Sequence, residues 1–95
     1  MVKTILYFGT EWCHGCRILK PNLKETEKEP TYSHIKYEYI DCDMEPGAQL
    51  AEVYNIKSIP VLIFLDEKNN VIWRNEGTIS KGDIMHKIDE INDGK

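Results

Sequence analysis

Two short, unbroken apolar runs constrain the fold of this chain more than any other feature. One lies near the N-terminus at residues 5–8 and is closed by Gly9, and the other is Val61–Leu65. Both are composed of β-favouring residues between turn signals, which predicts strands at residues 3–8 and 61–65. Because a continuously apolar strand has to be covered on both faces, the second run indicates a central strand between two layers.

The segment after the first strand has the pattern of a long helix. It is expected to begin near Cys13 and to end at about residue 28. Its core face would be formed by Ile18, Leu19 and Leu23. Pro21 lies inside it, and because proline has no N–H and its ring clashes with the preceding turn, a kink is predicted there.

Residues 35–40 alternate in the manner of an edge strand, with Lys36 and Glu38 on one side, where their charges discourage further pairing. A short helix is then expected from residue 46, where a proline opens it, to residue 54. Its inward side chains would be Leu50, Val53 and Tyr54.

The last part of the chain predicts a hairpin and a closing helix. Only a short turn separates Val61–Leu65 from a strand at residues 71–75. Ser80 and Asp83 have the spacing of a capping box, and the helix after them would face the core with Ile84, Ile88 and Ile91. The order β-α-β-α-β-β-α predicts one α/β domain over residues 1–95, a four-stranded mixed sheet of order 2-1-3-4 with helices on both faces.

Charge and hydropathy exclude several classes of protein. Twelve basic and 16 acidic side chains give a formal net charge of -4, which argues against a nucleic-acid partner. No segment approaches the roughly 20 apolar residues of a membrane span, and the N-terminal apolar stretch is too short for a signal peptide. A cytoplasmic protein with no membrane association is therefore expected. We also expect it to be a monomer.

Cys13 and Cys16 carry the chemistry that the sequence suggests. They stand one helical turn apart where a strand passes into a helix, so that their sulfurs can meet. Cys13 would lie at the helix N-terminus, where free N–H groups and the helix dipole stabilise the thiolate that disulfide exchange needs. The alternative is half of a zinc site, but Cys42 and the histidines form no second ligand pair. No metal or cofactor is expected.

Several motifs together resemble the thioredoxin family. Residues 5–16 are Ile-Leu-Tyr-Phe-Gly-Thr-Glu-Trp-Cys-His-Gly-Cys, similar to the thioredoxin active-site segment, in which a tryptophan precedes the first cysteine. Pro21 falls where the family has its helix-kinking proline. The pair Ile59 and Pro60 before the central strand looks like the family's cis-proline loop, and Gly77 resembles its lead into the last helix.

The resemblance implies a dithiol–disulfide oxidoreductase acting on disulfide-containing proteins. Cys13 would attack a target disulfide, Cys16 would resolve the mixed disulfide, and an NADPH-dependent thioredoxin reductase would reset the pair. By the same resemblance, the substrate-binding residues would be Trp12, Ile59, Pro60 and Gly77. His14 and Gly15 replace the family's usual Gly-Pro, and a cationic His14 would make the pair more oxidising.

The chain also departs from the family pattern. Tyr7 stands where thioredoxins have a buried aspartate beneath the second cysteine, and the usual first strand and helix are absent. Cys42 is expected to be a half-buried structural thiol. Two other functions stay open: a glutaredoxin-like reductase that uses glutathione, and a thioredoxin-like binding subunit of a larger complex.

Overall fold

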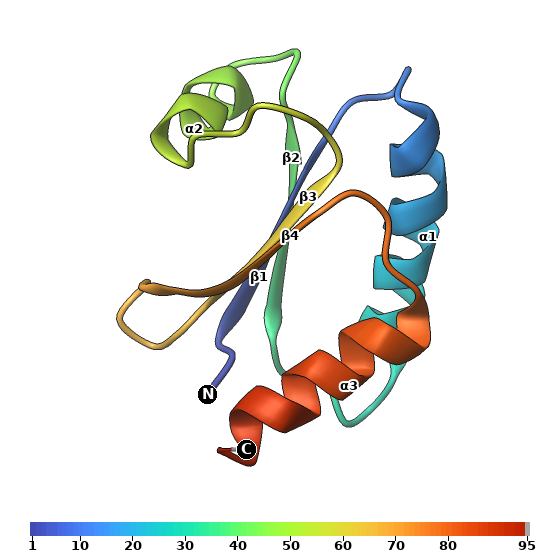
Figure 1. Cartoon of the computed structure of the whole chain (residues 1–95), viewed down its shortest axis with the longest axis vertical. Coiled ribbons are helices and arrows are strands. Elements are labelled where there is room, and N and C mark those ends of the chain that lie inside the picture. The colour runs from blue at the N-terminus through green and yellow to red at the C-terminus, as the bar shows by residue number, and fades with distance from the viewer. Residues whose placement is uncertain (95) are drawn as a thin grey trace.

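The computed structural model describes residues 1–94, which form a four-stranded sheet and three helices (Figure 1). The elements lie in the expected order, and every expected boundary is within one residue of the observed one. They are β1 (Thr4–Gly9), α1 (His14–Lys28), β2 (Lys36–Asp41), α2 (Gly47–Val53), β3 (Val61–Leu65), β4 (Val71–Glu76) and α3 (Lys81–Asn92).

The sheet has the strand order β2-β1-β3-β4, which confirms the predicted 2-1-3-4 arrangement. β1 runs parallel to β2, because α1 carries the chain back across the sheet between them. β1 is antiparallel to β3, and the hairpin makes β4 antiparallel to β3. The sheet is therefore mixed, and β1 and β3 are its central strands.

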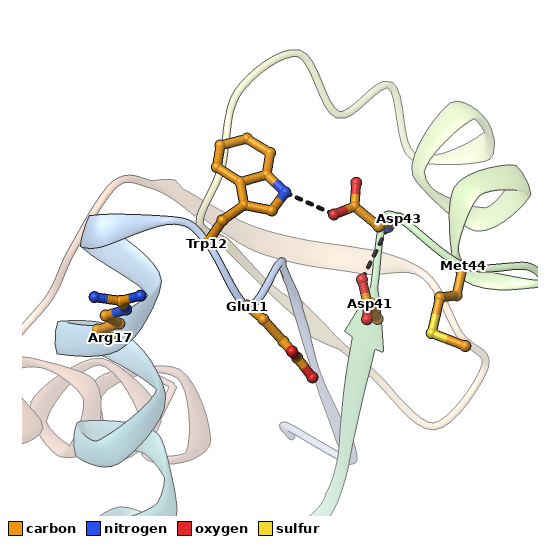
Figure 2. Close-up of a pocket in the computed structure, with 6 residues that line it drawn as sticks. All are labelled: Glu11, Trp12, Arg17, Asp41, Asp43 and Met44. Atoms are coloured by element: carbon orange, nitrogen blue, oxygen red, sulfur yellow. Dashed lines mark hydrogen bonds between the residues drawn. The ribbon is translucent and has the colours of Figure 1, made fainter.

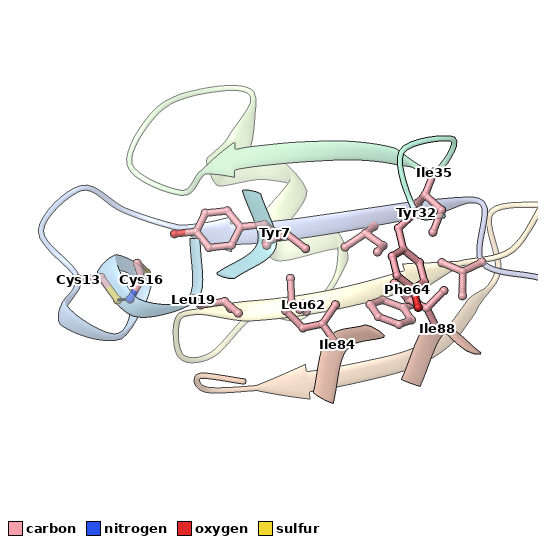
Figure 3. Close-up of a cluster of buried hydrophobic side chains, with 13 residues drawn as sticks. Tyr7, Cys13, Cys16, Leu19, Tyr32, Ile35, Leu62, Phe64, Ile84 and Ile88 are labelled. Atoms are coloured by element: carbon pink, nitrogen blue, oxygen red, sulfur yellow. Dashed lines mark hydrogen bonds between the residues drawn. The ribbon is translucent and has the colours of Figure 1, made fainter. Parts of the chain in front are cut away.

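Alternate side chains of the central strands enter two separate cores. Tyr7, Leu62 and Phe64 belong to the larger cluster, on the face where α1 and α3 pack against each other (Figure 3). Phe8 and Ile63 belong to the smaller cluster on the opposite face, which α2 covers (Figure 1). This confirms that helices cover both faces of the sheet and that β3 is buried on each side.

The predicted core face of α1 is wrong at one position. Ile18 is 47% exposed, whereas Cys16, Leu19, Leu23 and Thr26 are the buried residues of the helix. These four follow the 3–4–3 spacing of a single helical stripe, and Ile18 lies beside that stripe instead of within it. Pro21 lies inside the helix, which continues on both sides of it.

The predicted inward face of α2 is also wrong, for Leu50 and Val53, which are 37% and 74% exposed. The helix meets the sheet through Gly47, where a side chain would collide with the Asp41 carbonyl. Tyr54 packs inward as predicted, with its ring centroid 5.6 Å from that of Phe8. The close approach at Gly47 sets the rotation of this two-turn helix. The Glu45–Pro46 bond just before it is cis, which the sequence analysis did not foresee.

The closing helix has the predicted cap and core face. The Asp83 backbone N–H donates a hydrogen bond of 3.1 Å to the Ser80 hydroxyl, which caps α3. Ile84 and Ile88 are fully buried against the sheet. No helix within residues 1–94 is long and apolar enough to cross a membrane.

Candidate active site

The two cysteines lie at the junction between β1 and α1. Cys13 is the N-cap residue of α1, with an extended backbone, and its sulfur accepts a hydrogen bond of 3.2 Å from the backbone N–H of Cys16. The sulfur therefore occupies the place where a helix N-terminus offers unpaired N–H donors to a negative charge. Both cysteines are buried, with 6% and 3% of their surface exposed, and both are free thiols.

The surroundings of Cys16 change the pKa of its thiol. Burial, followed by the hydrogen bond to Cys13, raises the pKa of the Cys16 thiol above its ordinary value. Hydrogen bonds from the Tyr7 side chain and the Thr10 backbone act in the opposite direction and offset part of this rise. Cys16 thus keeps its proton at neutral pH.

The loop that leads into β3 lies against this turn, because the start of β3 pairs with the end of β1. A Cβ atom on Gly15 would come within 3.0 Å of Pro60 Cδ and 3.4 Å of Thr78 Cγ2, so the proline ring packs directly on the first turn of α1. The Ile59–Pro60 peptide bond is cis. Gly77, with a φ of +97° that favours glycine, donates its backbone N–H to the Pro60 carbonyl at 2.8 Å. Gly15, Pro60 and Gly77 therefore lie close together beside the cysteine pair.

Trp12 directly precedes Cys13 and is 68% exposed. Its indole N–H donates a hydrogen bond of 2.6 Å to an Asp43 carboxylate oxygen (Figure 2). A surface hollow of about 480 Å³ lies beside this contact and is lined by Glu11, Trp12, Arg17, Asp41, Asp43 and Met44. Asp43 was missed by the sequence analysis, because it lies 31 residues from Trp12 and no local pattern marks it.

Tyr7 lies beneath the pair. It is 4% exposed, and its hydroxyl points from β1 toward the cysteine turn (Figure 3). Burial and a hydrogen bond with Cys16 raise the pKa of this phenol far above its ordinary range. Tyr7 is therefore a neutral hydroxyl against the inner cysteine.

The remaining candidate residues lie farther from the sulfurs or face solvent. His14 is exposed as the first residue of α1. Cys42 is half-buried, and burial, followed by the Asp41 carboxylate, raises the pKa of its thiol. Within residues 1–94, no three or more His, Cys, Asp or Glu side chains gather closely enough to hold a metal ion.

Comparison with known proteins agrees with this geometry. A family model described as Thioredoxin matches residues 2–90. Thioredoxin of Buchnera aphidicola subsp. Acyrthosiphon pisum is 35% identical over 83 residues, which cover 87% of this chain and 73% of that protein. Thioredoxin 2 of Plasmodium berghei is 31% identical over 85 residues, which cover 88% of this chain and 51% of that protein.

Solved structures give the same result. A thioredoxin-2, described as a component of malaria parasite protein secretion machinery, matches with a TM-score of 0.82 at 25% identity, over 92% of this chain and 81% of that one. Chloroplastic thioredoxin z matches with a TM-score of 0.79 at 25% identity, over 94% and 77% of the two chains. With a close-set pair of cysteines at the N-terminus of α1, the chain belongs to the thioredoxin family and is a thiol–disulfide oxidoreductase of the thioredoxin type.

Proposed function

We propose that Cys13 is the nucleophile and Cys16 the resolving thiol in the reduction of protein disulfides. The observation that carries this assignment is the position of the Cys13 sulfur at the helix N-cap, where it accepts the Cys16 N–H. The Cys13 thiolate attacks one sulfur of the target disulfide, forming a mixed disulfide and releasing the other sulfur as a thiolate. The Cys16 thiolate then attacks the Cys13 sulfur, which forms the Cys13–Cys16 disulfide and releases the second target sulfur.

The residues around the pair form the proposed contact surface for the target. Its members are the exposed Trp12 and, in the loops that precede and follow the β3–β4 hairpin, Ile59, Pro60 and Gly77. Gly15 lies in contact with Pro60, so the target chain and the first turn of α1 would meet at this proline. A target segment that runs extended across the Ile59 backbone would be held through main-chain hydrogen bonds, which accept many sequences.

His14 is the proposed modulator of the pair. It is the first residue of α1, directly after Cys13 in the chain, and it is exposed. Its imidazolium form would stabilise the thiolate of the reduced state and make the pair a better oxidant. Removal of this side chain by His14→Ala is therefore expected to make the pair more reducing.

The catalytic cycle needs a reductant for the Cys13–Cys16 disulfide. We assign this role to an NADPH-dependent thioredoxin reductase acting on a monomeric protein in a reducing compartment such as the cytoplasm. An insulin-reduction assay separates this route from a glutaredoxin-like one, because turnover should follow NADPH with a thioredoxin reductase and not glutathione alone.

The test of the two assignments is a pair of serine variants. Cys13→Ser is expected to abolish insulin reduction, because no thiolate is left to open the target disulfide. Cys16→Ser is expected to accumulate a covalent adduct with the target, visible on a non-reducing gel and released by dithiothreitol. Equal alkylation of Cys13 and Cys16 at neutral pH, or an adduct formed through Cys16, would contradict the assignment.

A further inference from the structure

Tyr7 is a buried polar side chain that the exchange chemistry described above does not use. It lies in the middle of β1, opposite Tyr39 on one side and Leu62 on the other. Its hydroxyl hydrogen-bonds with the side chain of Cys16. The two groups meet above Gly9, where a Cβ would come within 2.7 Å of the Tyr7 ring carbon Cζ and 2.8 Å of the Cys16 sulfur. The absence of a side chain at Gly9 is what permits this contact.

The geometry points to Tyr7 as a positioning residue for the resolving step, in which its hydroxyl donates a hydrogen bond to the Cys16 thiolate. This inference rests on the proposed role of Cys16 as the resolving thiol. A buried thiolate is costly unless donors surround it. In this structure, the donors on the inner side of Cys16 are the Tyr7 hydroxyl and the Thr10 backbone.

Tyr7 is suited to donate a proton in a hydrogen bond and not to remove one. Burial and the three nearby sulfurs of Cys16, Cys13 and Cys42 all oppose a negative charge on the phenol and raise its pKa. The hydroxyl therefore stays neutral through the physiological pH range and always has a hydrogen to offer. A neutral donor stabilises Cys16 when it is charged, which is the state that attacks the mixed disulfide.

Water can approach Tyr7, the neighbour of Cys16, from the surface. A small hollow of about 90 Å³ reaches Tyr7 and is lined by Tyr7, Gly9, Thr10, Glu11, Lys20, Ile40 and Asp41. Its polar walls suit water, and a hollow of this volume admits several water molecules. In the resolving step, the Cys16 S–H proton passes to solvent, the Cys16–Cys13 bond forms, and the target leaves as a thiolate that takes up a proton from solvent.

The test separates the two thiol steps in a Cys42→Ser background, which leaves only Cys13 and Cys16. One equivalent of 5,5′-dithiobis(2-nitrobenzoate) reacts first with Cys13, and attack by Cys16 then releases the second thionitrobenzoate, so the two steps appear as two absorbance phases. Tyr7→Phe removes only the hydroxyl. It is expected to slow the second phase about tenfold and to move its pH profile about one unit upward, while the first phase is unchanged.

Tyr39→Phe is the matched control. The Tyr39 ring lies 5.7 Å from the Tyr7 ring, but its hydroxyl donates to Glu27 at 2.8 Å and not to a cysteine. This variant loses a half-buried hydroxyl from the same face of the sheet and should leave both phases at the wild-type rate. An equal effect of the two variants would show a general loss of packing and would overturn the inference.

The remaining outcomes are also decisive. An unchanged second phase in Tyr7→Phe overturns the role of Tyr7, whereas loss of the first phase in the parent protein overturns the role of Cys13 instead. If Tyr7→Phe fails to fold, replacement of Tyr7 by 3-fluorotyrosine keeps the hydroxyl and makes it a stronger donor. The second phase should then be faster than in the parent, and a slower or equal second phase would refute the proposal.

Discussion

At the scale of single residues, Gly15 and Gly82 show how packing decides the effect of one methyl group. Each is the second residue of its helix, after His14 in α1 and after Lys81 in α3. A Cβ on Gly82 would meet no atom within 4 Å, whereas one on Gly15 would press on the Pro60 ring at 3.0 Å. The two glycines therefore form a matched pair with the same helical position and different surroundings.

Gly82→Ala is expected to raise the free energy of unfolding by about 0.4–1 kcal/mol, because alanine has less backbone freedom to lose on folding. Gly15→Ala should raise the free energy of unfolding by less than this, or lower it. It should also slow insulin reduction, because the new methyl group displaces the Pro60 ring, which lies beside the cysteines. Urea unfolding and the insulin assay measure the two effects. Equal gains in stability with full activity in both variants would refute the packing of Pro60 on α1.

Cys42 is the first residue after β2 and takes no part in the proposed exchange. Its backbone N–H donates to the Gly9 carbonyl at 2.9 Å, and its side chain packs against the smaller core. Because burial and Asp41 raise the pKa of its thiol, it should stay protonated and react slowly with iodoacetamide at neutral pH.

Cys42→Ser is accordingly expected to retain at least half of the insulin-reducing activity and the two-phase thiol reaction. Mass spectrometry after brief alkylation at pH 7 should find Cys42 unmodified while Cys13 is labelled. Loss of most activity, or a disulfide-linked dimer through Cys42 as the active form, would show that this thiol has a function of its own.

At the scale of the elements, neighbouring residues of α1 differ sharply in what they contribute. Leu19 is fully buried between the sheet and α3, and Ile18 is 47% exposed. Leu19→Ala is expected to lower the free energy of unfolding by about 2–5 kcal/mol, as for other core truncations. Ile18→Ala should change it by about 0.5 kcal/mol or less, because surface substitutions rarely do more. Similar losses from both variants would mean that α1 is rotated about its axis.

The difference between local patterns and contacts made only in the folded state explains which parts of the fold can be predicted from the sequence. β3 was found at its correct bounds because five consecutive apolar residues have one plausible structure, a strand covered on both faces. The rotation of α2 could not be found this way. It depends on the close approach of Gly47 to the Asp41 carbonyl, a contact that only the assembled sheet creates.

The site was predictable to a similar degree. Cys13 and Cys16 stand out because the pair follows a strand and opens a helix, and the resemblance added Pro60 and Gly77. Asp43 could not be found, because its role depends on the turn after β2 coming beside Trp12 in space. Local patterns thus identify the reacting atoms, and the groups that surround them come from distant parts of the chain.

At the scale of the whole molecule, four tyrosines connect the cysteine site with the far end of the sheet. The rings of Tyr7 and Tyr39 lie 5.7 Å apart, and the Tyr37 hydroxyl donates to the Tyr32 carbonyl at 3.0 Å. Tyr32 in turn donates to both carboxylate oxygens of Asp89 in α3, at 2.9 and 3.0 Å. Burial is the first cause that raises the pKa of each of these four phenols.

These raised values predict how the stability of the folded protein depends on pH in the alkaline range. In the unfolded chain, tyrosine ionises near pH 10. The folded state holds its four phenols neutral beyond that point, so above pH 10 the unfolded state loses protons that the folded state keeps. The stabilisation is fully present below pH 10 and is lost as the pH rises from 10 through the raised folded values.

The free energy of unfolding should therefore fall steeply above pH 10, and Tyr37→Phe, which removes one such group, should make the fall shallower. Urea unfolding at pH 8, 10 and 11 measures the slope, and absorbance at 295 nm reports ionised tyrosine directly. In the folded protein these four phenols should ionise only together with loss of the far-ultraviolet circular dichroism signal, while the urea-unfolded chain titrates near pH 10. Ionisation of all the tyrosines near pH 10 with the fold intact would contradict their burial in the sheet.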